Sequence, residues 1–305
     1  MKLDDQDRFT YTVTSSGPAQ GMKFAGRGRV DAATPASSDI PLVIAIHGGG
    51  YTSEYFDIPG YSLLDRASRL QIPIIAIDRP GYGGSDASSS DAAVLLTNAE
   101  LLDHVIGDLW KEHGTGTSGV VLIGHSIGGA VALALAARGP AWPLLGVAVS
   151  GCLLREPEHF HDAWAAFPGT SMHPSDEQRA FLMFGGPEWT LRGDMPSRST
   201  VAHAPVLVSE LIEISGSWEE TFRRELAPAI SVPVHLRQGE FEQLWITNDA
   251  EVAEFAAELT SSPFVDAEVF QSAGHAIDFH RGGAAFQVQQ LAFALDCCAR
   301  RIKEQ

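Results

Sequence analysis

A serine flanked by glycines is the residue of this chain best placed for covalent chemistry. It lies in Gly124-His125-Ser126-Ile127-Gly128, between an apolar run and an Ala/Leu-rich run. In a G-x-S-x-G turn between a strand and a helix, the serine hydroxyl is exposed at the top of a sheet and the glycines leave room for the neighbouring backbone. The helix also directs its positive N-terminal end at this point. The spacing predicts Ser126 as a nucleophile; a glycine-rich turn without a catalytic role is the alternative.

A second glycine-rich segment could stabilise negative charge. The apolar run Pro41 to Ile46 ends in His47-Gly48-Gly49-Gly50. Residues without side chains let backbone N–H groups approach a developing oxyanion, and the residue after the nucleophile supplies another such group. We therefore predict an oxyanion hole made by the amides of Gly49 and Ile127, with Gly50 as a further donor.

These motifs together resemble the α/β-hydrolase family, and the resemblance covers nearly the whole chain. The loop Asp78 to Ser85 (DRPGYGGS) is similar to the D-x-x-G-x-G-x-S turn of that family. In this fold the triad follows the chain order serine, acid, histidine. The resemblance therefore implies that the base is His275, which follows the strand-like run Phe264 to Phe270. A structural loop histidine is the alternative, and that role suits His280 better.

The resemblance also implies a position for the acid. The family places it after the strand that follows the cap, a few residues beyond a glycine, and here Gly239 is followed by Glu240 and Glu242. Glu242 matches the family position, although aspartate is commoner there. Glu240 and Asp249 remain as alternatives. The related dehalogenases and epoxide hydrolases use aspartate as the nucleophile at the position of Ser126. Serine in this turn, called the nucleophile elbow, therefore argues against those two activities.

Alternating strand-like and helix-like segments must position these residues. A hairpin is expected first, then a turn-rich stretch at Thr34 to Asp39, and then buried strands separated by amphipathic helices. Continuous apolar runs of this kind are typical of parallel strands buried on both faces. The sequence predicts an α/β fold with a doubly wound, mainly parallel sheet. The expected strands are Phe9–Val13, Met22–Val30, Pro41–Ile46, Ile72–Ile77, Val120–Ile123, Leu144–Val149, Val232–Leu236 and Phe264–Phe270, and the helices are Tyr61–Leu70, Ala92–His113, Ile127–Arg138, Asp249–Leu259 and Ala284–Ile302.

One aromatic-rich segment interrupts this alternation. We predict that residues 152–228 form an inserted helical cap, and that residues 1–151 and 229–305 form the hydrolase core. A cap over the carboxyl ends of the strands would cover the place where open α/β sheets bind ligands. Most of the cap aromatics are expected in the core of the cap and the remainder at a pocket. The predicted substrate-binding residues are Tyr51, His125, Trp164, Phe181, Phe184 and Trp189.

Composition narrows the classes of function. The chain has 305 residues and a net charge of −17, which disfavours nucleic acids and anionic membrane surfaces as partners. The N-terminus has no apolar signal segment, and the three cysteines have no disulfide or zinc spacing, so a reducing cytoplasm is expected. His159, His161 and His173 are interpreted as surface residues of the cap, because no further ligands complete a metal site. The sequence does not determine the oligomeric state, and a homodimer is one of the alternatives that stay open.

Together these observations predict a serine hydrolase without a cofactor that acts on a small or medium organic ester; a thioester or lactone also fits. Two alternatives stay open. One is another reaction on the same scaffold, such as amide, peptide or carbon–carbon bond cleavage or lyase chemistry. The other is a ligand-binding module with negligible turnover, since a fold does not fix a function.

Overall fold

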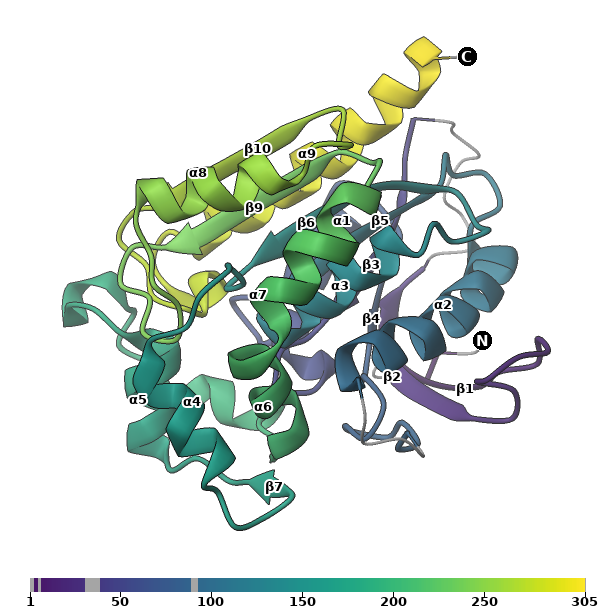
Figure 1. Cartoon of the computed structure of the whole chain (residues 1–305). Coiled ribbons are helices and arrows are strands. Elements are labelled where there is room, and N and C mark those ends of the chain that lie inside the picture. Colours follow the sequence, from purple (N-terminus) through teal and green to yellow (C-terminus); the bar gives the residue numbers. More distant parts are fainter. Residues whose placement is uncertain (1–2, 5–6, 31–38, 89–92, 305) are drawn as a thin grey trace.

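An eight-stranded sheet forms the centre of the molecule (Figure 1). The computed structural model describes residues 3–4, 7–30, 39–88 and 93–304. The strand order is β1-β2-β4-β3-β5-β6-β9-β10; β1 is antiparallel to β2 and β2 to β4, and all other neighbours are parallel. The predicted mainly parallel α/β sheet is thus confirmed. The strands are β1 Arg8–Thr12, β2 Lys23–Arg29, β3 Leu42–Ile46, β4 Ile74–Ile77, β5 Val120–His125, β6 Leu144–Ser150, β9 Val234–Gly239 and β10 Val265–Phe270.

The central strands are apolar on both faces because helices cover both faces of the sheet. Every residue of β3 is buried. Leu42 and Ile44 belong to one apolar cluster with residues of α2, α3 and α8, whereas Val43 and Ala45 belong to another with residues of α1 and α9. This two-sided burial explains why the strand sequences are continuous apolar runs rather than alternating ones.

The helices of the core connect these strands. They are α1 Leu63–Arg69, α2 Val94–His113, α3 Ile127–Ala137, α8 Asp249–Glu258 and α9 Gly283–Glu304, close to the predicted bounds. Of the predicted turn-rich stretch at Thr34 to Asp39, only Asp39 is among the described residues, and Ala92, the first residue of the predicted second helix, also lies outside them.

A long insertion separates β6 from β9, and the predicted cap at residues 152–228 lies within it. Figure 1 shows α4, α5 and α6 grouped with β7 at one end of the sheet. Two short strands, β7 and β8, pair antiparallel inside it, a feature that the sequence did not predict. The elements are α4 Glu158–Ala165, β7 Ser171–Met172, α5 Asp176–Phe184, β8 Val206–Leu207, α6 Val208–Gly216, α7 Trp218–Thr221, a π-helical turn Phe222–Leu226, and 3-10 turns at Glu188–Thr190, Ser197–Ala202 and Ala227–Ala229.

Within the described part of the chain, no helix combines the length and the apolar composition needed to span a membrane.

Candidate active site

Ser126 occupies a strained turn between β5 and α3. Its φ of 54° and ψ of −126° lie outside the regions that L-residues prefer, a conformation that costs about 1–3 kcal/mol and is found mainly at functional sites. The turn is tight enough to require glycine on both sides. A Cβ on Gly124 would lie 2.5 Å from the carbonyl oxygen of Gly128, and a Cβ on Gly128 would lie 2.2 Å from that of Ile46. Ser126 is half-buried at the start of α3, as a nucleophile elbow requires.

His275 and Glu242 form a fully buried pair in the loops that follow β10 and β9. Nδ1 of His275 lies 2.8 Å from Oε2 and 2.9 Å from Oε1 of Glu242, and neither side chain is exposed. The carboxylate is held from its other sides by three donors. The amides of Gln243 and Leu244 donate to Oε1, and Nε2 of Gln238 donates to Oε2, each at 2.9 Å. Glu242 can therefore fix both the orientation and the tautomer of the imidazole.

The other ring nitrogen of His275 is available for proton transfer. Nε2 is buried, and it has no hydrogen-bond partner among the residues that the structure describes. The ring lies against the same loops as the serine: the amide of Ser126 donates to the carbonyl oxygen of Ser150 at 2.7 Å, and a Cβ on the next residue, Gly151, would lie 2.8 Å from Cε1 of His275. In unliganded active sites such catalytic contacts are often long and tighten when substrate binds.

The alternative carboxylates contact other groups. Oε2 of Glu240 accepts a hydrogen bond from the amide of Ser272 at 2.7 Å, and Asp249 is the first residue of α8. His280 is buried, and its Nε2 accepts a hydrogen bond from the amide of Gly274 at 3.0 Å, which is a structural role. Glu242 is therefore the carboxylate that contacts His275.

The loop after β3 is fixed by its own histidine. The amide of Arg79 donates to Nε2 of His47 at 3.0 Å, so the ring proton is on Nδ1, which donates to the carbonyl oxygen of Gly48 at 2.8 Å. Burial, with the charge of Arg79 adding to it, lowers the pKa of His47 well below its usual value, so the ring is neutral. Within the described residues, the amides of Gly49 and Ile127 donate to no protein group. They can therefore receive an oxyanion.

A small, apolar cavity opens beside these groups. Its volume is about 60 Å³, well below the several hundred cubic ångströms of a site for a drug-sized molecule. Gly49, Ser126 and Ile127 line it from the core, whereas Gly50 does not. Arg179 is the one charged residue in the lining. The apolar side chains in the lining include Trp164, Met172, Leu182, Met183, Leu211 and Leu244.

Of the six predicted substrate-binding residues, Trp164 lines this cavity, and the other five are not among its lining residues. Phe181 is 61% exposed and Trp189 is 59% exposed. Phe184 packs on Phe279 in the core. Tyr51 is buried edge-on against Tyr55, and His125 stacks on the same ring at 4.6 Å.

The periodicity of α5 explains which of its side chains line the cavity. Arg179, Leu182 and Met183 lie three and four residues apart, so they share one face of the helix, and this face lines the cavity. Phe181 projects from another face. The i, i+3, i+4 spacing was a signal for the lining residues, but aromatic content directed the prediction to Phe181.

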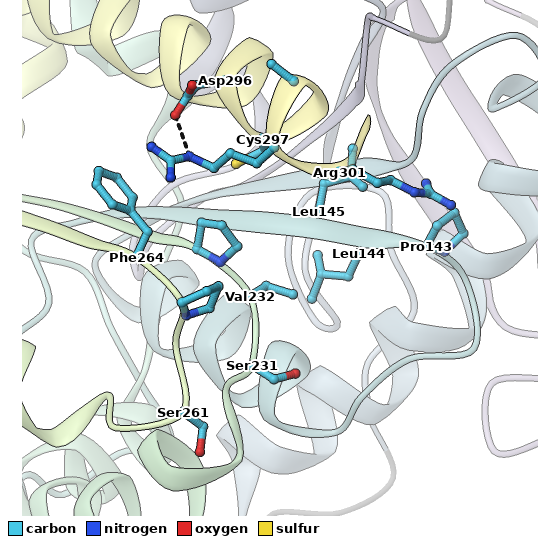
Figure 2. Close-up of a pocket in the computed structure, with 14 residues that line it drawn as sticks. Pro143, Leu144, Leu145, Ser231, Val232, Ser261, Phe264, Asp296, Cys297 and Arg301 are labelled. Carbon is cyan, nitrogen blue, oxygen red and sulfur yellow. Dashed lines mark hydrogen bonds and ion pairs between the residues drawn. The ribbon is translucent and has the colours of Figure 1, made fainter. Parts of the chain in front are cut away.

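A much larger groove lies elsewhere, at the amino ends of the parallel strands. Figure 2 shows this groove of about 900 Å³ between the starts of β6, β9 and β10 and the last turns of α9. Its labelled residues include Leu144, Val232 and Phe264, and an ion pair of 2.7 Å joins Asp296 to Arg300 at its edge. Open parallel sheets bind ligands at the opposite, carboxyl ends of their strands, where Ser126 is. The small cavity is therefore the candidate site.

Among the described residues, no three or more metal-ligating side chains lie close enough together to hold a metal ion. His159, His161 and His173 therefore form no such cluster. Nδ1 of His161 instead lies 3.3 Å from the carbonyl oxygen of Ser215, which links α4 to the end of α6.

The sheet order, the elbow and the buried histidine–glutamate pair define a class of protein. The model of the alpha/beta hydrolase family matches residues 43–286, and the chain belongs to this family. Among curated relatives it is 30% identical over 112 residues to protein phosphatase methylesterase 1 of Mus musculus and 35% identical over 114 residues to the magnesium-chelatase 30 kDa subunit of Rhodobacter capsulatus. The alignments cover 37% and 36% of this chain but only 28% and 35% of those proteins.

Solved structures resemble the chain over nearly its whole length. An esterase from Thermogutta terrifontis has a TM-score of 0.61 at 20% identity, with 94% of this chain and 98% of that one covered. A monoacylglycerol lipase from Paleococcus ferrophilus has a TM-score of 0.57 at 18% identity, with 97% and 100% covered. At these identities the likeness shows the fold.

Proposed function

We propose that the protein is a serine hydrolase that cleaves short carboxylic esters through an acyl-enzyme intermediate. The observation that carries the proposal is the buried contact of 2.8 Å between His275 and Glu242, which leaves Nε2 unpartnered in the same loop cluster as Ser126. An imidazole with a carboxylate on one ring nitrogen and no partner on the other is arranged to accept a proton there.

In the first step Ser126 Oγ attacks the ester carbonyl carbon while His275 Nε2 takes the hydroxyl proton. The carbonyl electron pair moves onto oxygen, which the amides of Gly49 and Ile127 stabilise, and Glu242 stabilises the imidazolium. The intermediate then collapses: the bond to the leaving alcohol breaks, and the alkoxide takes the proton from His275. Water attacks the acyl-enzyme by the same route, and the serine is released. No step requires a cofactor.

The cavity and the comparisons support an ester substrate with a short chain. A volume of about 60 Å³ suits an acyl group of only a few carbons. One relative is named a methylesterase, and the similar structures include an esterase and a lipase.

A reducing compartment such as the cytoplasm is supported by the cysteines Cys152, Cys297 and Cys298, which are all free and buried.

Turnover of p-nitrophenyl esters with acyl chains of two to eight carbons tests this proposal. We expect saturable hydrolysis with the highest kcat/KM at two to four carbons. No turnover above the buffer rate for any chain length would contradict the proposal and favour a binding module.

A further inference from the structure

A buried arginine lines the same cavity as the proposed nucleophile. Arg179 lies on α5 of the insertion and is only 7% exposed. Its neighbours in the lining include Ser126 and Gly49 on the core side and apolar side chains on the other. A buried arginine thus forms part of the wall of a small, mostly apolar cavity.

The hydrogen bonds of this guanidinium are all to neutral groups. NH1 donates to the carbonyl oxygen of Gly50 at 2.9 Å, and NH2 donates to that of Ala204 at 2.8 Å. The guanidinium carbon lies 5.7 Å from the centre of the Tyr51 ring, a cation–π contact. Since an arginine has five N–H donors, donor capacity remains beyond these two hydrogen bonds and the interaction with Tyr51.

No carboxylate of the described residues lies within 4 Å of the Arg179 guanidinium nitrogens. Asp176, one turn earlier on α5, is exposed, and it only weakly favours the charge of Arg179. Glu210 lies near the loop after β3 (His47 to Gly50), which we call the oxyanion loop. It is already paired with Arg79, however, and it accepts a hydrogen bond from Tyr82 at 2.7 Å. Among the described residues, therefore, none supplies a counter-ion for the charge of Arg179.

The titratable neighbours do not supply one either. Burial raises the pKa of Tyr51 to about 12, although Arg179 opposes the shift, so the phenol is neutral at physiological pH. Burial, with the charge of Arg179 adding to it, lowers the pKa of His203 to about 4, so this ring is also neutral. Buried charges in proteins are ordinarily paired, because an unpaired one is costly.

We propose that the missing counter-ion is a carboxylate on the acyl part of the substrate; this rests on the proposed esterase function. The substrate class is then a monoester of a short dicarboxylic acid. Gly49 and Ile127, whose amides would hold the carbonyl oxygen, line the cavity together with Ser126, and we assign the group that fills it to the acyl part of the ester. Its small volume restricts the spacer between the ester and the carboxylate to a few carbons. In a chain of net charge −17, a local cation is needed to attract an anionic substrate.

The test compares two esters of the same shape and different charge. Monoethyl succinate carries a carboxylate where ethyl succinamate carries a neutral amide. We expect wild-type kcat/KM to be about 10- to 100-fold higher for monoethyl succinate, the range of a charge-assisted hydrogen bond. Arg179→Gln is expected to reduce this ratio to about 1, and Arg179→Lys, which keeps the charge, to retain most of it. Arg198→Gln is the control: Arg198 is exposed in the insertion, pairs with Asp194, and should leave the ratio unchanged.

The outcomes separate this inference from the proposed function. A wild-type enzyme that hydrolyses neutral esters but shows a ratio of 1 or below overturns the inference and leaves the esterase proposal intact. A preference for a carboxylate on the alcohol part overturns the acyl assignment. If no ester is turned over, calorimetric binding of succinate to the wild type and to Arg179→Gln decides: binding lost in the variant supports the anion site, and no binding to the wild type overturns it. Should Arg179→Gln fail to fold, the ratio of kcat/KM for the two esters is compared between the wild type and Arg179→Lys. A wild-type ratio of about 10 to 100 that the lysine variant largely retains supports the inference, and a wild-type ratio of 1 or below overturns it.

Discussion

Replacing Glu242 by glutamine gives the sharpest test of the proposed triad. The carboxylate accepts four hydrogen bonds, from His275, Gln238 and the amides of Gln243 and Leu244. A glutamine has one acceptor oxygen and one NH₂ group. If its NH₂ group replaces Oε1, it faces two backbone amides; if it replaces Oε2, it faces the Gln238 side-chain amide and His275. Either orientation leaves buried donors unpaired.

The expected size of the effect follows from these contacts. A buried donor left unpaired costs about 1–3 kcal/mol, so two of them would destabilise the fold by about 2–6 kcal/mol. The effect on catalysis is separate. With an NH₂ group beside it, Nδ1 of His275 becomes an acceptor and the ring proton moves to Nε2, which can then no longer accept a proton from Ser126. Loss of the correct tautomer and of the stabilising charge is expected to lower kcat by up to about 10⁴-fold.

The assay should measure kcat per folded enzyme, with circular dichroism to count the folded fraction. Glu242→Asp keeps the charge but is about 1.5 Å shorter, so its kcat should lie between those of the wild type and the glutamine variant. Glu240→Gln is the matched control, because Glu240 accepts from the amide of Ser272 and not from His275. The reasoning is refuted if Glu242→Gln keeps kcat within tenfold of the wild type, or if Glu240→Gln is the variant that loses it.

Three further predictions test the nucleophile, a buried carboxyl group and the pocket. Ser126→Ala should lower kcat by at least about 10³-fold, and a fluorophosphonate should label one peptide, that of Ser126; labelling elsewhere would contradict the assignment. Burial, with the charge of Glu242 adding to it, raises the pKa of Glu156 from 4.5 to about 8, so the folded protein keeps a proton that the unfolded chain releases. The stability that this proton contributes is therefore complete below pH 4.5 and is lost as pH rises to about 8. Urea unfolding of the wild type at pH 5 and pH 8 should show a loss of about 3–4 kcal/mol, which Glu156→Gln should remove; a variant that loses as much stability as the wild type would contradict this. Trp164→Ala should shift the preferred acyl chain to longer esters, by up to about fourfold per methylene, whereas the exposed Phe181→Ala should not; equal effects would place the pocket elsewhere.

The parts of the fold that the sequence predicted well are those governed by local chemistry. The apolar runs of β3 and β4 and the glycines around Ser126 reflect constraints that act within a few residues: burial on both faces and close backbone approach. These patterns also predicted the glycine-rich loop after β3, His47 to Gly50, for which we propose the role of oxyanion hole. The parallel order of the sheet followed because strands alternate with helices along the chain.

The lining of the cavity could not be predicted in the same way. Phe181 and Trp164 are both aromatic residues on helices of the insertion. Phe181 is nevertheless exposed, whereas Trp164 lines the cavity together with Ser126, because the difference depends on how α4 and α5 pack on the core. The sequence does not identify Arg179 as a residue of the cavity for the same reason, because its surroundings depend on the packing of α5. An arginine in a helix is usually solvated, and only the fold shows that this one is buried beside Gly50 without a carboxylate.

The insertion and the oxyanion loop are coupled through a buried ion pair. Glu210 of α6 pairs with Arg79, whose Nε donates to the carbonyl oxygen of His47 at 2.8 Å, and both charged side chains are fully buried. Removing one partner would leave the other charge uncompensated, at a cost of about 3–5 kcal/mol, and would release the carbonyl next to the oxyanion loop. The insertion therefore does more than cover the site, since α6 helps to hold the loop that positions Gly49. The same comparison strengthens the case for a ligand at Arg179. Both arginines are buried against this loop, but Arg79 is paired with a carboxylate, whereas Arg179 has none among the described residues and lines the cavity in which the proposed substrate would supply one.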